Sequence, residues 1–272
     1  MTIPRFVILA KAGIHKIILP FFVIAFSITA SIFAPIILAS AQTDYEYQYG
    51  QYRLNYPEYK LLKADYLNTP SLDNQQKAMI AAKQSIGARE QTKATFSQYI
   101  LDLIGKTQTV YPPIQPIIAS LAASREFYLM QAQKSQGIIT QDDLKTFSLT
   151  YQKETQHHDR MIKFGILARK LASLVRTQID SITALDDLVS KLPETLPVTV
   201  TARIQELRDS NKLIDAKIDL ISKNLDFVES EESADAEIFF SSRVEKLIDI
   251  QAMQLDWITR LIDIDKNYAT NR

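Results

Sequence analysis

Two adjacent histidines, His157 and His158, have the most conspicuous chemistry in this sequence, because no other histidine follows residue 41. Adjacent side chains on a helix point about 100° apart, so the two rings cannot easily share one metal ion. Glu154, His158 and Met161 would share a helix face, and Glu-x-x-His pairs occur in di-iron bundles. Those sites need a second such pair, which this chain lacks. The pattern therefore favours a solvated polar surface over a metal or haem site, and we expect no cofactor.

Other reactive groups are sparse. The sequence has no cysteine, which excludes disulfides, thiolate metal sites and cysteine nucleophiles. It has neither a Gly-x-Ser-x-Gly motif nor a Gly-rich phosphate loop. Three acidic pairs have the residue types of a glycoside hydrolase, but two of them stand beside expected helix ends or turns, where acidic residues are favoured anyway: Asp142-Asp143, Asp186-Asp187 and Glu231-Glu232. We expect no enzyme, and a carboxylate-based envelope hydrolase is the alternative.

The first forty-one residues have the layout of a secretory leader. Arg5, Lys11 and Lys16 precede an uncharged run over 17–43, and an Ala-Ser-Ala sequence at 39–41 lies near its end. A basic start, an apolar stretch and a small-x-small exit are typical of an export signal. Because the positive residues all precede the apolar run, the body of the chain is expected on the outer side of the membrane.

The apolar stretch 17–38 is long enough for two roles. A cleaved leader needs about 7–15 apolar residues and a bilayer span about 20. Pro35 would break a helix just before the small residues, and cleavage after Ala41 needs an extended chain. Segment 1–41 is therefore predicted to be a signal peptide or an N-terminal membrane anchor. The body is extracytoplasmic in both cases, secreted or membrane-anchored, with membrane contact through 17–38 in the second.

The body beyond residue 41 is close to neutral. The leader contains three basic residues and no acidic one, so the body keeps 28 basic and 31 acidic residues. Nucleic-acid binding needs a concentrated basic face, and we therefore expect no nucleic-acid partner. An exported chain without disulfides must be held together by its core alone, for which roughly 230 residues are enough.

Glycine and proline are nearly absent from the body, which predicts an all-α fold. No proline occurs from Ile117 to Leu192 or from Val198 to Arg272. Strand-rich proteins need turn residues every 8–12 positions, and this chain lacks them. We predict an elongated antiparallel bundle of four to five long helices with coiled-coil-like seams. Its parts are a Tyr-rich N-terminal helical segment, 42–108, and a long-helix bundle, 109–272.

Local signals place the expected helix ends. Ser71 is a good N-cap for a helix to about Lys106, and Gly137 should end the helix that starts near Pro116. Thr140-x-x-Asp143 resembles a capping box at the start of a helix to Leu192. Further helices are expected over about 198–229 and 234–268.

The middle of the segment 140–192 is unusual because residues 152–160 include no apolar side chain. We expect that no face of this stretch is buried. It is predicted to be either a solvated part of a long projecting helix or a break between two helices.

The last two helices carry the clearest periodicity. A 3-4-3-4 seam with Asn211 as its single polar member predicts a coiled coil: Ile204, Leu207, Asn211, Ile214, Ile218, Ile221, Leu225 and Val228. We predict that Asn211 sets the register, with a ligand role as the alternative. The final helix has two seams, Phe240, Leu247, Ile250, Trp257, Leu261, Ile264 and Tyr268, and Val244, Ile248, Leu255, Ile258 and Ile262. Two seams predict more than one neighbour, with Trp257 in the core.

Tyrosines follow the leader at heptad spacing. We call this set the tyrosine strip: Tyr45, Tyr49, Tyr52, Tyr56, Tyr59 and Tyr66. A phenol ring offers apolar area with a polar tip, which suits a half-buried surface. The strip is interpreted as the packing face of an amphipathic helix, with a docking surface for a glycan, peptide or membrane interface as the second reading and disorder as the third. Gly50 and Pro57 would weaken and bend the helix.

The pattern Tyr49-x-x-Tyr52-Arg53-x-x-Tyr56-x-x-Tyr59-x-x-x-Lys63-x-x-Tyr66-Leu67, followed by Gln75-Gln76-Lys77-Ala78-x-x-Ala81-Ala82-Lys83, resembles uncharacterised exported Tyr-rich helical proteins of poorly characterised small-genome bacteria. The resemblance covers about residues 42–105. It implies an exported helical protein and implies no activity.

These observations predict a non-enzymatic structural or protein-interaction component of the cell envelope. Its partner would be another protein or a second copy, bound through helix faces. The candidate interaction surfaces are the tyrosine strip and the region of His157 and His158. The alternative is a ligand- or metal-binding helical bundle in the extracytoplasmic space.

Overall fold

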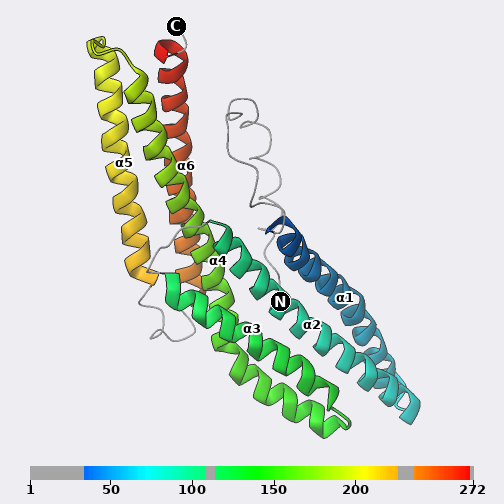
Figure 1. Cartoon of the computed structure of the whole chain (residues 1–272). Helices are drawn as coiled ribbons and strands as arrows, with labels where there is room; N and C mark the ends of the chain where they lie inside the picture. Colours follow the sequence, from blue (N-terminus) through cyan, green and yellow to red (C-terminus); the bar gives the residue numbers. More distant parts are fainter. Residues whose placement is uncertain (1–33, 108–113, 226–235, 270–272) are drawn as a thin grey trace. The chain divides into compact units, whose positions relative to one another are not determined.

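The computed structural model describes residues 34–107, 114–225 and 236–269 (Figure 1). Within these residues all regular structure is helical and there is no strand, which confirms the all-α prediction. The predicted leader lies outside the described residues apart from 34–41. None of the described helices combines the length and the apolar character needed to cross a membrane. The chain divides into two compact units, Met1–Ile37 and Leu38–Arg272, and the apolar core belongs to the second.

Six long helices make up the described structure. They are α1 (Ala34–Asn68), α2 (Leu72–Lys106), α3 (Gln115–Gln136), α4 (Gln141–Lys191), α5 (Val198–Leu225) and α6 (Ala236–Ile264), with a π-helical turn at Asp265–Ala269. The helices α2 to α6 begin and end close to the predicted positions.

Side-chain caps explain why α2 and α4 begin where they do. The Ser71 hydroxyl accepts a hydrogen bond from the Asn74 amide at 3.1 Å. At the start of α4 the capping box is complete, because the Asp143 amide donates to Thr140 Oγ1 at 3.1 Å and the Thr140 amide donates to Asp143 Oδ2 at 2.8 Å. Gly137 caps the end of α3, as predicted.

Replacing Thr140 with alanine is expected to lower the free energy of unfolding by about 1 kcal/mol, because the Asp143 amide loses its acceptor. Thr140→Ser keeps the hydroxyl and is the matched control. Urea denaturation followed by circular dichroism measures both variants. An equal loss in the two variants would show that the cap does not stabilise α4.

The start of α1 differs from the prediction. Pro35 lies in the first turn of α1, so residues 39–41 are helical and not extended. A proline favours the first turn of a helix, because its missing N–H would have no partner there. The helix also continues through Pro57 without a break, so the tyrosine strip lies on one helix.

The tyrosine strip of α1 faces α2. Tyr45 lies in the first part of α1, and its ring centroid is 4.9 Å from that of Phe96 and 6.1 Å from that of Tyr99. Both of these residues lie near the C-terminal end of α2. At the far end of α1, Gln141 Nε2 of α4 donates to the Tyr66 hydroxyl at 3.3 Å. Because the start of α1 lies beside the last part of α2 and only residues 69–71 join the two helices, α1 and α2 run antiparallel. The ring contacts of Tyr45 favour the packing interpretation of the strip at this residue.

The helix α4 is shared by two groups of three helices. Its first part packs with α2 and α3, and its second part packs with α5 and α6. Figure 1 shows α4 extending from beside α3 to beside α5 and α6. At about 1.5 Å rise per residue, α4 is roughly 75 Å long, which allows one helix to serve both groups.

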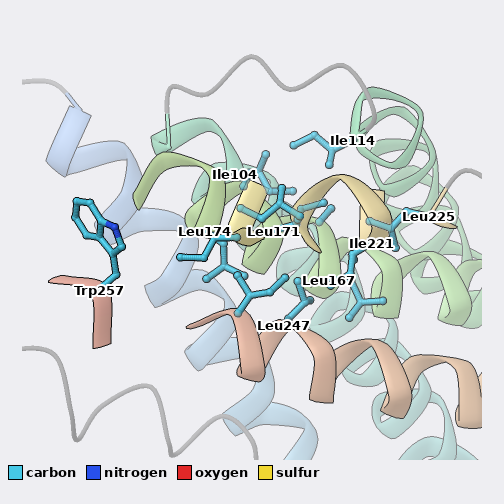
Figure 2. Packing of buried hydrophobic residues seen from close by; sticks show 14 of the residues in the cluster. Ile104, Ile114, Leu167, Leu171, Leu174, Ile221, Leu225, Leu247 and Trp257 are labelled. Atoms are coloured by element: carbon cyan, nitrogen blue, oxygen red, sulfur yellow. The ribbon is translucent and has the colours of Figure 1, made fainter. Parts of the chain in front are cut away.

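The apolar core is continuous where the two groups meet. Leu167 and Leu171 of α4 are buried in one cluster with Ile104 of α2, Ile221 of α5 and Leu247 of α6 (Figure 2). Close approach of α3 to α4 depends on Gly165, because a Cβ atom there would lie 2.7 Å from Leu121 Cδ2. Packing of branched apolar side chains, without disulfides, holds the helices together.

One expectation about burial is wrong. The stretch 152–160 is a continuous part of α4, as one alternative predicted, but Thr155 on it is buried. This burial is possible because the Thr155 hydroxyl donates to the Tyr151 carbonyl oxygen at 2.9 Å. The helix α6 contacts both α4 and α5, which confirms that it has more than one neighbour. In its second seam Val244 and Ile258 pack against the core, whereas Ile248, Leu255 and Ile262 are 50, 66 and 43 % exposed.

Candidate functional site: a buried polar network and an exposed heptad row

A buried carboxylate lies at the centre of the first helix group. Glu90 of α2 is 0 % exposed. Arg89 Nε donates to Glu90 Oε1 at 2.6 Å, and the Tyr151 hydroxyl of α4 donates to Glu90 Oε2 at 2.8 Å. The Arg89 guanidinium also lies 4.3 Å from the Tyr151 ring centroid. Burial raises the pKa of Glu90, and the nearby charges of Arg89 and Lys93 oppose that rise.

A second carboxylate extends this cluster toward α3. Lys93 Nζ contacts Asp159 Oδ1 at 2.7 Å and the Tyr151 hydroxyl at 3.2 Å. The Tyr128 hydroxyl donates to the same Asp159 oxygen at 2.6 Å. We call the set that these bonds connect the polar network; its members are Arg89, Glu90, Lys93, Tyr128, Tyr151 and Asp159.

Both phenols in the polar network act as hydrogen-bond donors. Burial raises the pKa of Tyr128 strongly, and the neighbouring Asp159 carboxylate raises it further. Burial likewise raises the pKa of Tyr151, with Glu90 adding to the effect. The hydroxyl protons therefore remain in place, and each phenol donates to one carboxylate oxygen, Tyr151 to the fully buried Glu90 and Tyr128 to the partly exposed Asp159. Such a network connects three helices through groups that would be costly to bury alone.

His158 lies beside this network, in the region where sequence suggested a site. Its Nδ1 is 3.0 Å from Ser124 Oγ of α3, and the Phe127 ring stacks on the imidazole with centroids 3.9 Å apart. Burial lowers the pKa of His158, and the neighbouring His157 lowers it further. His157 itself is exposed.

The Ser124–His158 pair has the residue types of a nucleophile and its base, but the hydrogen bonds point the other way. The Ser124 hydroxyl donates its one proton to the Ser120 carbonyl oxygen at 2.8 Å. His158 Nδ1 must then be the donor to Ser124 Oγ. In this arrangement the imidazole orders α3 against α4 and does not activate the hydroxyl, which is fully buried.

The acidic and histidine side chains near His158 do not converge on a common point. Within residues 34–107, 114–225 and 236–269, no group of three or more His, Asp or Glu is placed to hold a metal ion. Glu154 instead accepts a hydrogen bond from Gln131 at 3.2 Å. A shallow, open depression on α4 is lined by Leu149, Thr150, Lys153 and Glu154.

Asn211 lies in a second polar layer, in the other helix group. It is buried on α5, and Gln178 of α4 donates to its side-chain oxygen at 3.3 Å. Gln254 of α6 donates to Gln178 Oε1 at 3.3 Å and to the Leu174 carbonyl oxygen at 2.8 Å. One polar side chain from each of the three helices thus meets at one level of the bundle. A layer of this kind has the chemistry of a register-setting contact.

The outer row of α6, Ile248, Leu255 and Ile262, is the exposed remainder of its second seam. The three residues recur every seven positions, so they follow one line along the helix. A parallel line of carboxylates lies directly beside it, one position later in each heptad: Asp249, Asp256 and Asp263. All three are exposed, and Asp256 contacts Arg260 of its own helix at 2.7 Å.

The other predicted surface residues lie on α1. Tyr49, Tyr52, Tyr59 and Tyr66 are half-buried on the side of α1 that carries Tyr45, and Tyr56 is exposed. The strip and the two histidines do not form one site.

Neither Glu90 nor Tyr151 was among the residues predicted to form a site. A glutamate beside an arginine on a polar helix has the local pattern of a solvated surface, and no signal near either residue indicates burial.

Comparison with known proteins gives no match to a protein-family model, a curated protein or a solved structure.

Proposed function

We propose that the protein is a non-enzymatic, extracytoplasmic envelope component that binds a partner helix on the outer row of α6. The observation that carries the proposal is a heptad line of large apolar side chains exposed beside a heptad line of carboxylates. A helix normally buries such a row, and exposed apolar rows rimmed by polar residues mark interaction sites. The apolar line and the acidic line lie side by side along α6. This asymmetry selects the orientation of a bound helix.

The partner expected here is an amphipathic helix with an apolar heptad row flanked by lysine or arginine. Its apolar row would pack on Ile248, Leu255 and Ile262, and its basic flank would face Asp249 and its heptad equivalents. A second α6 fits poorly, because it would bring a second line of exposed carboxylates, Asp249, Asp256 and Asp263, to the interface. Charge complementarity of this type sets partner choice and orientation in helix-in-groove recognition.

The polar network supports a structural role for the first helix group. The carboxylates Glu90 and Asp159 each accept hydrogen bonds from side chains of the protein itself. The network thereby fixes how α2, α3 and α4 pack, and α4 carries that order to the group that contains α6. We take the whole as the antiparallel bundle with coiled-coil-like seams that the sequence predicts, exported by the N-terminal segment.

The proposal is tested by the affinity of the full-length protein, in detergent, for designed helical peptides. One peptide carries a leucine heptad row flanked by lysine, a second has the same row flanked by glutamate, and a third keeps the lysines with glutamine in place of leucine. We expect only the first to bind, more weakly at higher salt because part of the attraction is electrostatic. Fluorescence anisotropy of labelled peptides provides the measurement.

The variant Leu255→Glu should abolish binding of the first peptide, because it places a charge in the centre of the row. Leu213→Glu, at an exposed leucine of α5, is the matched control and should leave binding unchanged. Equal binding of the lysine- and glutamate-flanked peptides, or normal binding by Leu255→Glu, would overturn the proposal.

A further inference from the structure

A second exposed heptad row lies on α1, on the side opposite the tyrosine strip. Tyr47, Leu54 and Leu61 are 61, 68 and 63 % exposed and recur every seven residues. Tyr45 and Tyr52 each stand two residues before a member of this row, about 200° away around the helix. With the tyrosine strip against α2, this outer row of α1 points away from the helix that α1 packs on.

The outer row of α1 is one half of a heptad seam. If Tyr47, Leu54 and Leu61 occupy a positions, the d positions between and after them hold the small or compact residues Gly50, Pro57 and Ala64. Large side chains on one line and small ones on the next let two such helices approach closely, with each a residue packing against the partner's backbone.

The charges that flank this seam decide what it can pair with. Arg53 and Lys60 occupy its g positions, and Glu58 and Asp65 occupy its e positions. In a parallel two-stranded coiled coil, a g residue faces the e residue five positions later on the other helix. Two copies of α1 side by side would therefore place Arg53 opposite Glu58 and Lys60 opposite Asp65. Two-fold symmetry repeats both attractive pairs.

The antiparallel arrangement is unfavourable for the same residues. There g positions face g positions, which brings Arg53 and Lys60 of the two copies together, and e positions face e positions, which brings Glu58 and Asp65 together. Arg53 and Lys60 are exposed and lie over the Tyr49 and Tyr56 rings, 5.9 and 5.7 Å from the centroids. Their side chains lie along α1 and extend to a neighbouring helix by rotation alone.

We propose that the outer row of α1 binds α1 of a second copy of this chain, as a parallel, two-fold symmetric coiled coil. The inference deepens the proposed interaction role and rests on it, but its surface is separate from the outer row of α6. A two-fold contact closes on itself, so it produces a dimer and leaves both α6 rows available.

The size of the row predicts a weak dimer. Each copy contributes only three large side chains, and their burial must offset the loss of freedom on association. The ion pairs at the edges are exposed to solvent and mainly select the orientation. We therefore expect dissociation on dilution and on addition of salt.

Cysteine crosslinking of the full-length protein tests the proposal directly, because the natural chain contains no cysteine. Single variants Tyr47→Cys, Leu54→Cys and Leu61→Cys are oxidised in detergent, and dimers are counted on non-reducing gels. In the parallel arrangement each residue faces its own copy, so all three variants should give disulfide dimers. Leu213→Cys, at an exposed leucine of α5, is the control and should remain monomeric.

The crosslinking yields distinguish a parallel dimer from an antiparallel dimer and from random collision between monomers. An antiparallel pair centred on Leu54 would crosslink at Leu54 and not at Tyr47 or Leu61, which would overturn the parallel arrangement. Yields no higher than that of Leu213→Cys would overturn self-association altogether. If α1 fails this test while the outer row of α6 still binds the lysine-flanked peptide, the inference fails and the proposed function stands.

Charge reversal supplies a second, independent readout. In the Leu54→Cys background, the double change Arg53→Glu and Lys60→Glu should lower the dimer yield about tenfold, since four attractive contacts become repulsive. Adding Glu58→Lys and Asp65→Lys restores opposite charges and should restore the yield. Circular dichroism confirms that each variant stays helical. A yield that does not change on reversal, or does not recover in the quadruple variant, would contradict the pairing.

Discussion

Replacing Trp257 with alanine is expected to lower the free energy of unfolding by about 3–5 kcal/mol, the range found when a large buried aromatic ring is removed. Trp257 is 2 % exposed on α6, and its Nε1 donates to the Leu207 carbonyl oxygen of α5 at 2.8 Å. The substitution therefore leaves a cavity between α5 and α6 and removes one hydrogen bond across them. Urea denaturation followed by circular dichroism measures the loss.

Two further variants separate the contributions at Trp257. Trp257→Phe keeps most of the apolar area and loses the hydrogen bond, so its cost should be well below that of alanine. Leu255→Ala removes an exposed side chain from the same helix and should change stability by no more than about 0.5 kcal/mol. A similar loss in Leu255→Ala and Trp257→Ala would show that α6 does not pack as described.

Trp257 also reports whether the two helix groups unfold together. It is the single tryptophan of the chain and lies in the group formed by α4, α5 and α6, whereas circular dichroism reports all helices. Because the apolar core is continuous through Leu167 and Leu171, we expect the two transitions of the unaltered protein to coincide. Separate midpoints would mean that α4 does not couple the groups.

Features controlled by neighbours in the sequence were predictable. The capping box of Thr140 and Asp143 and the N-cap at Ser71 depend on side chains three residues from the amides they bind, so sequence alone places them. The burial of Asn211 follows in the same way from the period of its seam. Such features need no knowledge of which helices meet.

Contacts between distant helices were not predictable. The Tyr151 hydroxyl and the Glu90 carboxylate are 61 residues apart, and nothing near either residue indicates the other. Thr155 and His158 were expected in solvent because their neighbours are polar, yet α3 covers this part of α4 with Ser124 and Phe127. A polar side chain is buried when another helix satisfies its hydrogen bonds, and single-helix periodicity does not contain that information.

Some apolar residues with heptad spacing are exposed in the structure, although such spacing normally predicts burial. The outer rows of α1 and α6 have the spacing of core residues, so a sequence reading assigns them neighbours within the chain, as it did for α6. The structure instead leaves Leu54 and Leu255 among the more exposed large residues. Since the flanking charges of α1 complement a second α1 and those of α6 do not complement a second α6, the two rows point to different partners.

Removing Arg89 from beside Glu90 is expected to cost about 2–3 kcal/mol at neutral pH. Loss of one partner of a buried ion pair costs about 3–5 kcal/mol, and the Arg89 side chain is 32 % exposed, so solvent lessens the effect. The variant is Arg89→Ala, measured by urea denaturation. In a Glu90→Gln background the same change should cost much less, because no buried charge is left without its partner.

The free energies of unfolding of the unaltered protein and of Glu90→Gln, compared across pH, show whether burial favours or disfavours the Glu90 charge. Burial raises the pKa of Glu90 above its usual 4.5, so the folded state prefers the protonated carboxyl. The stabilisation that comes from this raised pKa of Glu90 is therefore fully present below pH 4.5. It is lost as the pH rises through the folded-state pKa. Because glutamine imitates the protonated form, the unaltered protein should lose stability relative to Glu90→Gln as the pH increases above 4.5.

Asp143 provides the control, because its shift has the opposite sign. Hydrogen bonds from the Thr140 and Ile139 amides lower the pKa of Asp143 below 3.8. The stabilisation that Asp143 gives is present above pH 3.8 and is lost as the pH falls. The unaltered protein should therefore gain stability relative to Asp143→Asn as the pH rises through the acid range. Parallel curves for the two variants would show that a general charge effect, and not the burial of Glu90 against Arg89 and Tyr151, governs the pH response. Divergent curves would show that burial disfavours the Glu90 charge in the folded state and that Arg89 and Tyr151 offset only part of this cost.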